Sequence, residues 1–164
     1  MILDVNDLPQ HLPTGTRLIG MDLGEKTIGL ALSDPRLKVA SPLETIRRRK
    51  FREDAAALKE IIEARQVGGL VLGLPVNMDG SEGPRCQSTR QFAANLVEIA
   101  GFGQPIALWD ERLSTAAVER LLVSEADMSR GRRRQVVDKM AAAYILQGAL
   151  DALARNEREG RTQP

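Results

Sequence analysis

Acidic residues occupy three positions in this sequence where they could do chemistry. Two positions follow apolar runs typical of buried strands, and the third interrupts an apolar helical stripe; the residues are Asp22, the pair Asp110 and Glu111, and Asp138. Carboxylates on rigid elements are what a two-metal site for phosphodiester cleavage needs, and their oxygens suit Mg²⁺ or Mn²⁺. Two such ions, about 3.5–4 Å apart, activate a water molecule and stabilise the leaving oxygen. The pattern therefore predicts metal-assisted hydrolysis.

The acids at the strand ends also have structural explanations. Asp22 lies between Gly20 and Gly24, whose small size lets an ion approach, but Asp also favours turns. Strand alternation sends Asp110 and Glu111 to opposite faces, so at most one of them can face the same site as Asp22. Both acids would also suit the N-terminus of a following helix, where the helix dipole favours negative charge.

Asp138 is harder to explain by structure alone. It shares one face of a predicted helix with four apolar residues, Ala141, Ala142, Ile145 and Ala149. An acid in register with a buried face needs a cation, a metal ion or a hydrogen bond. Its place in the first helical turn offers stabilisation by the helix dipole as the alternative.

Two clusters of basic residues suit phosphate binding, although charge runs most often form solvated surfaces. One cluster precedes the helix of Asp138 and consists of Arg130, Arg132, Arg133 and Arg134. The other comprises Arg47, Arg48, Arg49, Lys50 and Arg52. The chain has only one Trp, one Tyr and three Phe, so recognition of the nucleic-acid backbone is favoured over base stacking.

Composition narrows the remaining function classes. The 164 residues suit one domain with a real core, and the formal net charge of +1 leaves no global basic field. Cys86 is the only cysteine, so an intrachain disulfide is impossible, and one His beside one Cys excludes a classical zinc site. The N-terminus lacks a signal-peptide pattern, and no stretch reaches the length of a membrane span. We expect a cytoplasmic protein without a membrane partner.

The apolar patterns predict one α/β domain over residues 17–155, with a flexible N-terminal arm over 1–16 and a polar tail over 156–164. Predicted strands cover residues 17–21, 27–32, 39–46, 69–72 and 106–109, and Pro42 favours an edge position for the third of them. Predicted helices include 54–65, a segment around 92–99, one from Ser114 or Thr115 to Val123, and 135–155. Hairpins followed by alternating strands and helices indicate a mixed sheet with helices packed on it.

Four motifs in the same order give the chain a family resemblance. They are residues 20–24 with 28–34, 73–75 with 79–80, 110–115, and 138–142 with 145–147. Together they resemble the YqgF/RuvX family of RNase H-like proteins, which are described as pre-16S rRNA nucleases and earlier as Holliday junction resolvases. The match extends from about Arg17 to Leu153, which is nearly the whole predicted domain.

The resemblance implies an RNase H-like fold with a five-stranded mixed sheet flanked by helices. It also implies that Asp22, Glu111 and Asp138 gather Mg²⁺ or Mn²⁺ as catalytic and metal-binding residues. The implied activity is nucleolytic processing of the 5′ end of precursor 16S rRNA, with the pre-ribosomal particle as a partner. Either Arg112 or the arginines of residues 130–134 would hold the scissile backbone.

Three other functions stay open at this level. A junction resolvase would share the chemistry and differ in substrate, whereas a non-catalytic pre-ribosome-binding protein would not need all three acids. An actin-like or sugar-kinase-like ATPase uses a similar turn but requires a second related domain, for which this chain is too short. Because the chain shows no heptad seam and its apolar segments are all needed for one core, we expect a monomer or a weak dimer.

Overall fold

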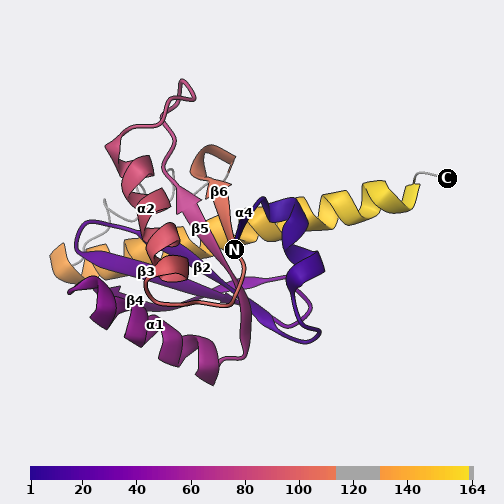
Figure 1. Cartoon of the computed structure of the whole chain (residues 1–164). Coiled ribbons are helices and arrows are strands. Elements are labelled where there is room, and N and C mark those ends of the chain that lie inside the picture. Colours follow the sequence, from indigo (N-terminus) through magenta and orange to yellow (C-terminus); the bar gives the residue numbers. More distant parts are fainter. Residues whose placement is uncertain (114–129, 163–164) are drawn as a thin grey trace.

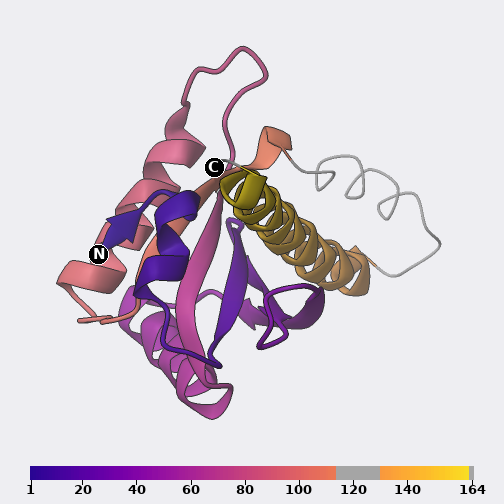
Figure 2. The same ribbon diagram turned by 90° about the vertical axis from the view of Figure 1, so that its right-hand side faces the viewer.

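A six-stranded mixed sheet forms the centre of the computed structural model, which describes residues 1–113 and 130–162, with side chains to residue 113 and from 137 to 161. The strands are β1 (Ile2–Leu3), β2 (Arg17–Leu23), β3 (Thr27–Ser33), β4 (Ala40–Arg47), β5 (Val67–Leu74) and β6 (Ile106–Asp110). The helices are η1 (Val5–His11), α1 (Phe51–Ala64), α2 (Pro84–Glu98), η2 (Glu111–Leu113) and α4 (Arg130–Thr162). Helices α1 and α2 cover one face of the sheet and α4 covers the other (Figures 1 and 2).

The order of the strands follows from their sequences. The sheet runs β1-β6-β5-β2-β3-β4, with β2, β5 and β6 parallel and the β2–β3–β4 meander antiparallel. All eight residues of β5 are buried, as expected for a central strand with the uninterrupted apolar sequence VGGLVLGL. The edge position predicted from Pro42 is confirmed, because β4 is the last strand of the order and a proline cannot donate to a neighbour there.

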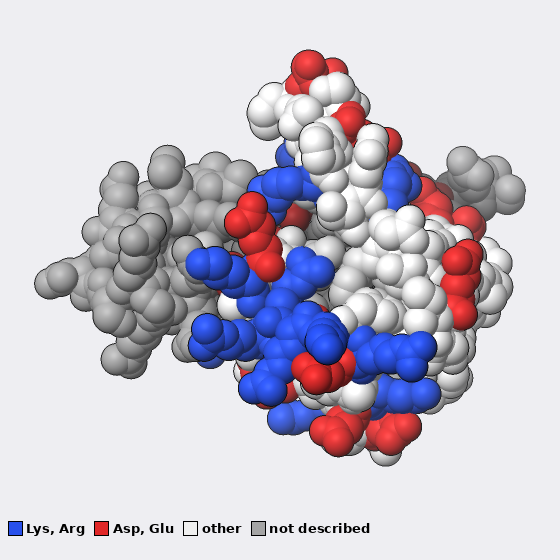
Figure 3. Space-filling view, turned by 60° about the vertical axis from the view of Figure 1, so that its left-hand side comes forward, with Lys and Arg blue, Asp and Glu red and all other residues white. Residues whose placement is uncertain are grey.

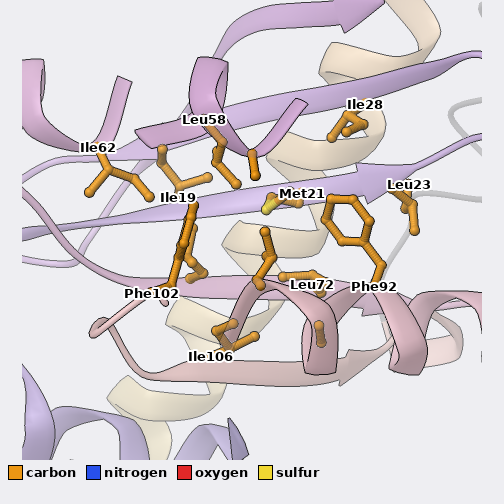
Figure 4. Packing of buried hydrophobic residues seen from close by; sticks show 14 of the residues in the cluster. Ile19, Met21, Leu23, Ile28, Leu58, Ile62, Leu72, Phe92, Phe102 and Ile106 are labelled. Atoms are coloured by element: carbon orange, nitrogen blue, oxygen red, sulfur yellow. The ribbon is translucent and has the colours of Figure 1, made fainter. Parts of the chain in front are cut away.

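Alternating side chains along the strands supply two hydrophobic cores, one on each face of the sheet. On the side of α1 and α2, Ile19, Met21 and Leu72 pack against Leu58 and Phe92 (Figure 4). On the opposite side, the α4 residues Ala142, Ile145 and Leu146 pack with residues of η1 and with the strand residues Leu18, Val71 and Ala107. Helix α4 therefore lies directly on the face that carries every second residue of β2.

The N-terminal segment differs from its prediction as a flexible arm. Ile2–Leu3 pairs in parallel with β6 as β1, so the sheet has six strands where five were expected. Leu8 in η1 is completely buried beside α4. The prolines and the short apolar pattern of this segment suggested a loop. The burial of the segment depends on contacts with distant elements, and no local periodicity reveals such contacts.

Helix α4 is longer than predicted. It begins at Arg130, five positions before the expected start at Gln135, and continues to Thr162 through most of the predicted tail. Its C-terminal part extends past the sheet, as Figure 1 shows, and carries an ion pair one turn apart between Arg161 and Glu157 at 3.0 Å. The helix predicted from Ser114 or Thr115 to Val123 lies outside the described residues. Within the described part, no helix is long and apolar enough to cross a membrane.

Candidate active site

Asp22 lies near the end of β2 and faces α4. Its neighbour on the same face, Gly20, is in such close contact with the helix that an added Cβ would come within 2.6 Å of the Cβ of Leu146. Asp22 is only 4% exposed, although it is an acid on a strand packed against a helix. A buried carboxylate of this kind needs compensation from hydrogen bonds or a cation.

Glycines flank Asp22 on both neighbouring strands, and the other two predicted acids lie over them. The register pairs Asp22 with Gly29 on β3, and it places Gly73 on β5 beside Asp22 because Met21 pairs with Leu72. A Cβ at Gly29 would overlap the backbone and side chain of Asp138. A Cβ at Gly73 would lie 2.7 Å from the Oε1 atom of Glu111.

The three acids therefore border a single strip of the sheet, formed by Gly29, Asp22 and Gly73. Each acid comes from a different element. Asp22 lies on β2, Glu111 on the short helix η2 after β6, and Asp138 on a half-buried part of α4. The two glycines lack the Cβ atoms that would otherwise overlap Asp138 over Gly29 and both Ile145 and Glu111 over Gly73. Glycine inside a strand commonly marks a place where another group approaches closely.

Thr27 positions the carboxylate of Asp138. The hydroxyl of Thr27, at the start of β3, donates a hydrogen bond to Oδ2 of Asp138. The two residues line a surface pocket of about 290 Å³ together with the β2–β3 turn, residues 24–26. A hydrogen bond from a neighbouring hydroxyl fixes the rotamer of a ligating carboxylate, which is the role of a supporting partner at metal sites.

We predict that Thr27→Val lowers metal affinity and cleavage by about 10–100-fold, the usual cost of losing such a partner. Valine keeps the β-branched shape that suits a strand, so the free energy of unfolding should change little. Thr27→Ser, which retains the hydroxyl, serves as the matched control and should stay near wild type. Mn²⁺ titration and single-turnover cleavage of both variants measure the difference. Equal behaviour of the two variants would show that the hydroxyl has no part in the site.

Asp110 belongs to the other face of the sheet, as strand alternation predicts. It pairs with Leu74, whereas the preceding Trp109 pairs with Gly73. Its carboxylate forms an ion pair of 2.7 Å with Arg112, whose side-chain hydrogen bonds lower the pKa of Asp110. The structure therefore brings Glu111 to the strip of Asp22 and ties Asp110 to an arginine.

Arg112 joins Asp110 to the loop after β5. Its backbone amide and guanidinium both donate to Asp110, and Nη1 lies 3.5 Å from the carbonyl oxygen of Met78. In the same loop the pKa of Asp79 is lowered, chiefly by hydrogen bonds from the hydroxyl and amide of Ser81. The side chain of Arg112 remains one-third exposed, so it can meet a phosphate while paired. The side chains of Arg130, Arg132, Arg133 and Arg134 lie outside the described residues.

The donor set of the strip fits a hard divalent cation. Its ligands would be carboxylate oxygens from Asp22, Glu111 and Asp138, which are the preferred donors for Mg²⁺ and Mn²⁺. Among the residues whose side chains are described, no three acidic, His or Cys side chains already form a compact ligand group. Like charges repel, so a bound cation would stabilise carboxylates that lie close together on this strip.

Sequence reasoning proposed the acids but did not single out the residues that pack against them. Gly29 and Gly73 could have been found, because a glycine inside an apolar strand signals close approach. Thr27 carried no such signal, since threonine is a common strand residue. Its importance appears only when the fold brings α4 over the start of β3.

The comparisons with known proteins identify the family. A family model described as "RuvX: Holliday junction resolvase" matches residues 16–152. The chain belongs to the RuvX family. A relative from Phenylobacterium zucineum is 60% identical over 152 residues, covering 93% of this chain and 97% of the relative. A relative from Roseobacter denitrificans is 62% identical over 154 residues, covering 93% and 94%. Both are named "Putative pre-16S rRNA nuclease".

Solved structures place this RuvX-family chain within a known fold. The RuvC protein of T. thermophilus, solved in complex with a Holliday junction substrate, superposes with a TM-score of 0.52 at 17% identity, covering 84% of this chain and 94% of RuvC. The yeast mitochondrial Holliday junction resolvase Ydc2 gives a TM-score of 0.50 at 12% identity, covering 95% and 86%. At such low identity the likeness concerns the fold, and the predicted RNase H-like α/β class is confirmed.

Proposed function

We propose that this RuvX-family chain is a metal-dependent nuclease that processes the 5′ end of precursor 16S rRNA. The observation that carries the proposal is the strip on which Asp22 lies between two glycines, with Asp138 and Glu111 over them. Membership of the family supports hydrolysis of phosphodiester bonds in nucleic acid. Relatives about 60% identical and named as nucleases of this RNA support the choice of substrate.

The residues of the strip would divide the work as follows. Bound Mg²⁺ or Mn²⁺ would supply an activated water and stabilise the developing charge on the leaving oxygen. Asp22, rigid and buried on β2, would fix the cation against the sheet. Glu111 and Asp138 would complete the ligand set from elements on either side, and Thr27 would hold Asp138 in its rotamer. Gly29 and Gly73 let Asp138 and Glu111 pack closely against the sheet on either side of Asp22.

Junction cleavage is the second candidate, because the matched family model carries that description. Resolving a four-way junction needs two matched cuts, which a twofold dimer with paired sites makes most simply. We propose instead a monomer or weak dimer that makes single cuts in the cytoplasm, on RNA within a pre-ribosomal particle. Arg112 and the arginines of residues 130–134 remain the proposed contacts to the scissile backbone.

A cleavage assay on two substrates tests the proposal. One substrate is RNA that carries the precursor 5′ end of 16S rRNA, and the other is a four-way DNA junction. We expect a single cut in the RNA and slower, unpaired cutting of the junction. Symmetric paired cuts in the junction, with the RNA left intact, would replace the proposal by the resolvase function.

We also predict that cleavage requires Mg²⁺ or Mn²⁺ and that Ca²⁺ supports it poorly. Calcium accepts longer bonds and looser geometry, which suits binding better than the positioning of an attacking water. Cleavage should stop in excess chelator and return when Mg²⁺ is added back. Undiminished cleavage in chelator would exclude a metal-dependent mechanism.

A further inference from the structure

A basic patch lies next to the strip of acids. It consists of Lys26 in the β2–β3 turn and of Arg47, Arg48, Arg49, Lys50 and Arg52, where β4 leads into α1. Figure 3 shows Lys and Arg side chains gathered on this side of the molecule, which is the left-hand side of Figure 1. All patch residues are exposed except Arg48, which is half-buried.

The patch is connected to the proposed active site through the β2–β3 turn and β3. Arg47 pairs with Thr27 in the sheet, and Thr27 donates its hydroxyl hydrogen bond to Asp138. The amide of Arg48 donates to the carbonyl oxygen of Lys26 at 2.8 Å, within the turn that lines the pocket of Asp138. A strand of nucleic acid that leaves the acids on this side must therefore pass the patch.

Fixed contacts hold the backbone of the patch in place. The guanidinium of Arg48 donates to the carbonyl oxygen of Gly24 at 2.6 Å and lies over the ring of Phe92. The buried carboxylate of Asp54 accepts a hydrogen bond from the amide of Arg49 at 2.9 Å. These contacts use one guanidinium and the backbone, and they leave the other cationic heads toward solvent.

The charge of the patch is not neutralised within the described structure. Within the two segments that form the patch, residues 24–27 and 47–54, six cations accompany three acids, Glu25, Glu53 and the buried Asp54, although the whole chain carries a net charge of only +1. None of the ion pairs between described residues involves a cation of the patch. Concentrated like charge destabilises a fold by self-repulsion, so an anionic partner accounts for a cluster that folding does not require.

The patch suits phosphates and does not suit bases. Phe51 is the only aromatic residue in segment 47–52, and it packs edge-on against Phe92 with ring centroids 5.6 Å apart. This one ring, already in contact with Phe92, does not form a platform for successive bases. Exposed arginine and lysine heads without an aromatic platform are typical of contacts that position a nucleic-acid backbone irrespective of sequence.

We propose that the basic patch binds the phosphodiester backbone of the RNA substrate on the Asp138 side of the active site. This inference rests on the proposed nuclease function for its choice of RNA, but it concerns binding and is independent of the metal. The patch would hold the strand beside the carboxylates, and its contribution would be the same for all sequences.

The test uses Arg49→Gln with Arg52→Gln, because both side chains are exposed and neither forms an ion pair with a described residue. Arg36→Gln with Lys38→Gln is the matched control: it removes the same charge beyond the opposite end of β3. Fluorescence anisotropy with the labelled precursor RNA, in chelator to prevent cleavage, gives affinity at several salt concentrations. Single-turnover cleavage of the same RNA with Mg²⁺ is measured separately.

We expect the patch variant to bind more than about tenfold more weakly at 0.1 M salt, with a log–log salt slope smaller by about 1.4 units, or about 0.7 for each lost contact to a single strand. The control should keep the wild-type slope. An unchanged slope in the patch variant, or an equal loss in both variants, would overturn the inference. A smaller salt slope in the patch variant, together with no cleavage of the RNA by the wild type, would support backbone binding by the patch and overturn the proposed nuclease function. Cleavage of the RNA by the wild type, together with an unchanged salt slope in the patch variant, would support the nuclease function and overturn backbone binding by the patch.

Discussion

Asp22→Asn should reduce cleavage by more than about a hundredfold while the protein stays folded. Losing a supporting partner of a metal ligand already costs about 10–100-fold, and Asp22 is proposed as the ligand fixed most rigidly, on a buried strand position. Asparagine has nearly the same shape, so packing against α4 is kept. Without metal, the melting temperature should hold or rise, because the substitution removes one charge from a group of like charges.

The variant separates catalysis from folding by two measurements. Single-turnover cleavage with Mg²⁺ reports the chemical step, and thermal unfolding in chelator reports stability. Asp110→Asn is the matched control, since Asp110 lies on the other face of the sheet and pairs with Arg112. Full activity in Asp22→Asn would remove this residue from the site. Loss of activity together with unfolding would show that its role is structural.

Gly29→Ala should have the second large effect, on both stability and cleavage. The new methyl group would overlap the backbone of Asp138, so α4 must move away from the sheet. Overpacking of this kind typically costs about 1–3 kcal/mol, which leaves an ordinary domain folded. A displacement of about 1 Å at a catalytic group can cost about a hundredfold in rate. Chemical denaturation and single-turnover cleavage measure the two effects.

Gly103→Ala is the control for this substitution. An added Cβ at Gly103 meets no heavy atom within 4 Å, and the residue does not require a positive φ. Its free energy of unfolding should stay within about 0.5 kcal/mol of wild type. If Gly29→Ala matched this control in both stability and cleavage rate, the close contact between β3 and Asp138 would be needed neither for stability nor for cleavage.

Much of the fold could be predicted from local patterns because the elements that make it are strongly apolar. The β2, β3, β5 and β6 strands all coincide with runs that the sequence marks, and Pro42 indicated the edge. The failures are at the ends of the chain. Segment 2–11 depends on contacts with β6 and α4, and the last turns of α4 are polar, so neither carries the periodicity that marks a buried element.

In the candidate site, too, some features are visible in the local sequence and others depend on contacts between distant elements. An acid after an apolar strand, or within an apolar helical face, is visible in the sequence because burial of a charge needs a reason. Strand alternation alone does not choose between Glu111 and Asp110, since it allows either one to face the site, and only the family resemblance favoured Glu111. The register of β5 with β6 favours Glu111, because it places Gly73 beside Trp109 and leaves Asp110 on the other face.

Mn²⁺ titration by calorimetry tests the central claim, that Asp22, Glu111 and Asp138 together bind the catalytic metal. The comparison includes wild type and the variants Asp22→Asn, Glu111→Gln, Asp138→Asn and Asp110→Asn. We predict that each of the first three variants weakens Mn²⁺ binding by at least about tenfold and that Asp110→Asn keeps the wild-type affinity. Wild-type affinity in Glu111→Gln, with binding lost in Asp110→Asn, would contradict the account.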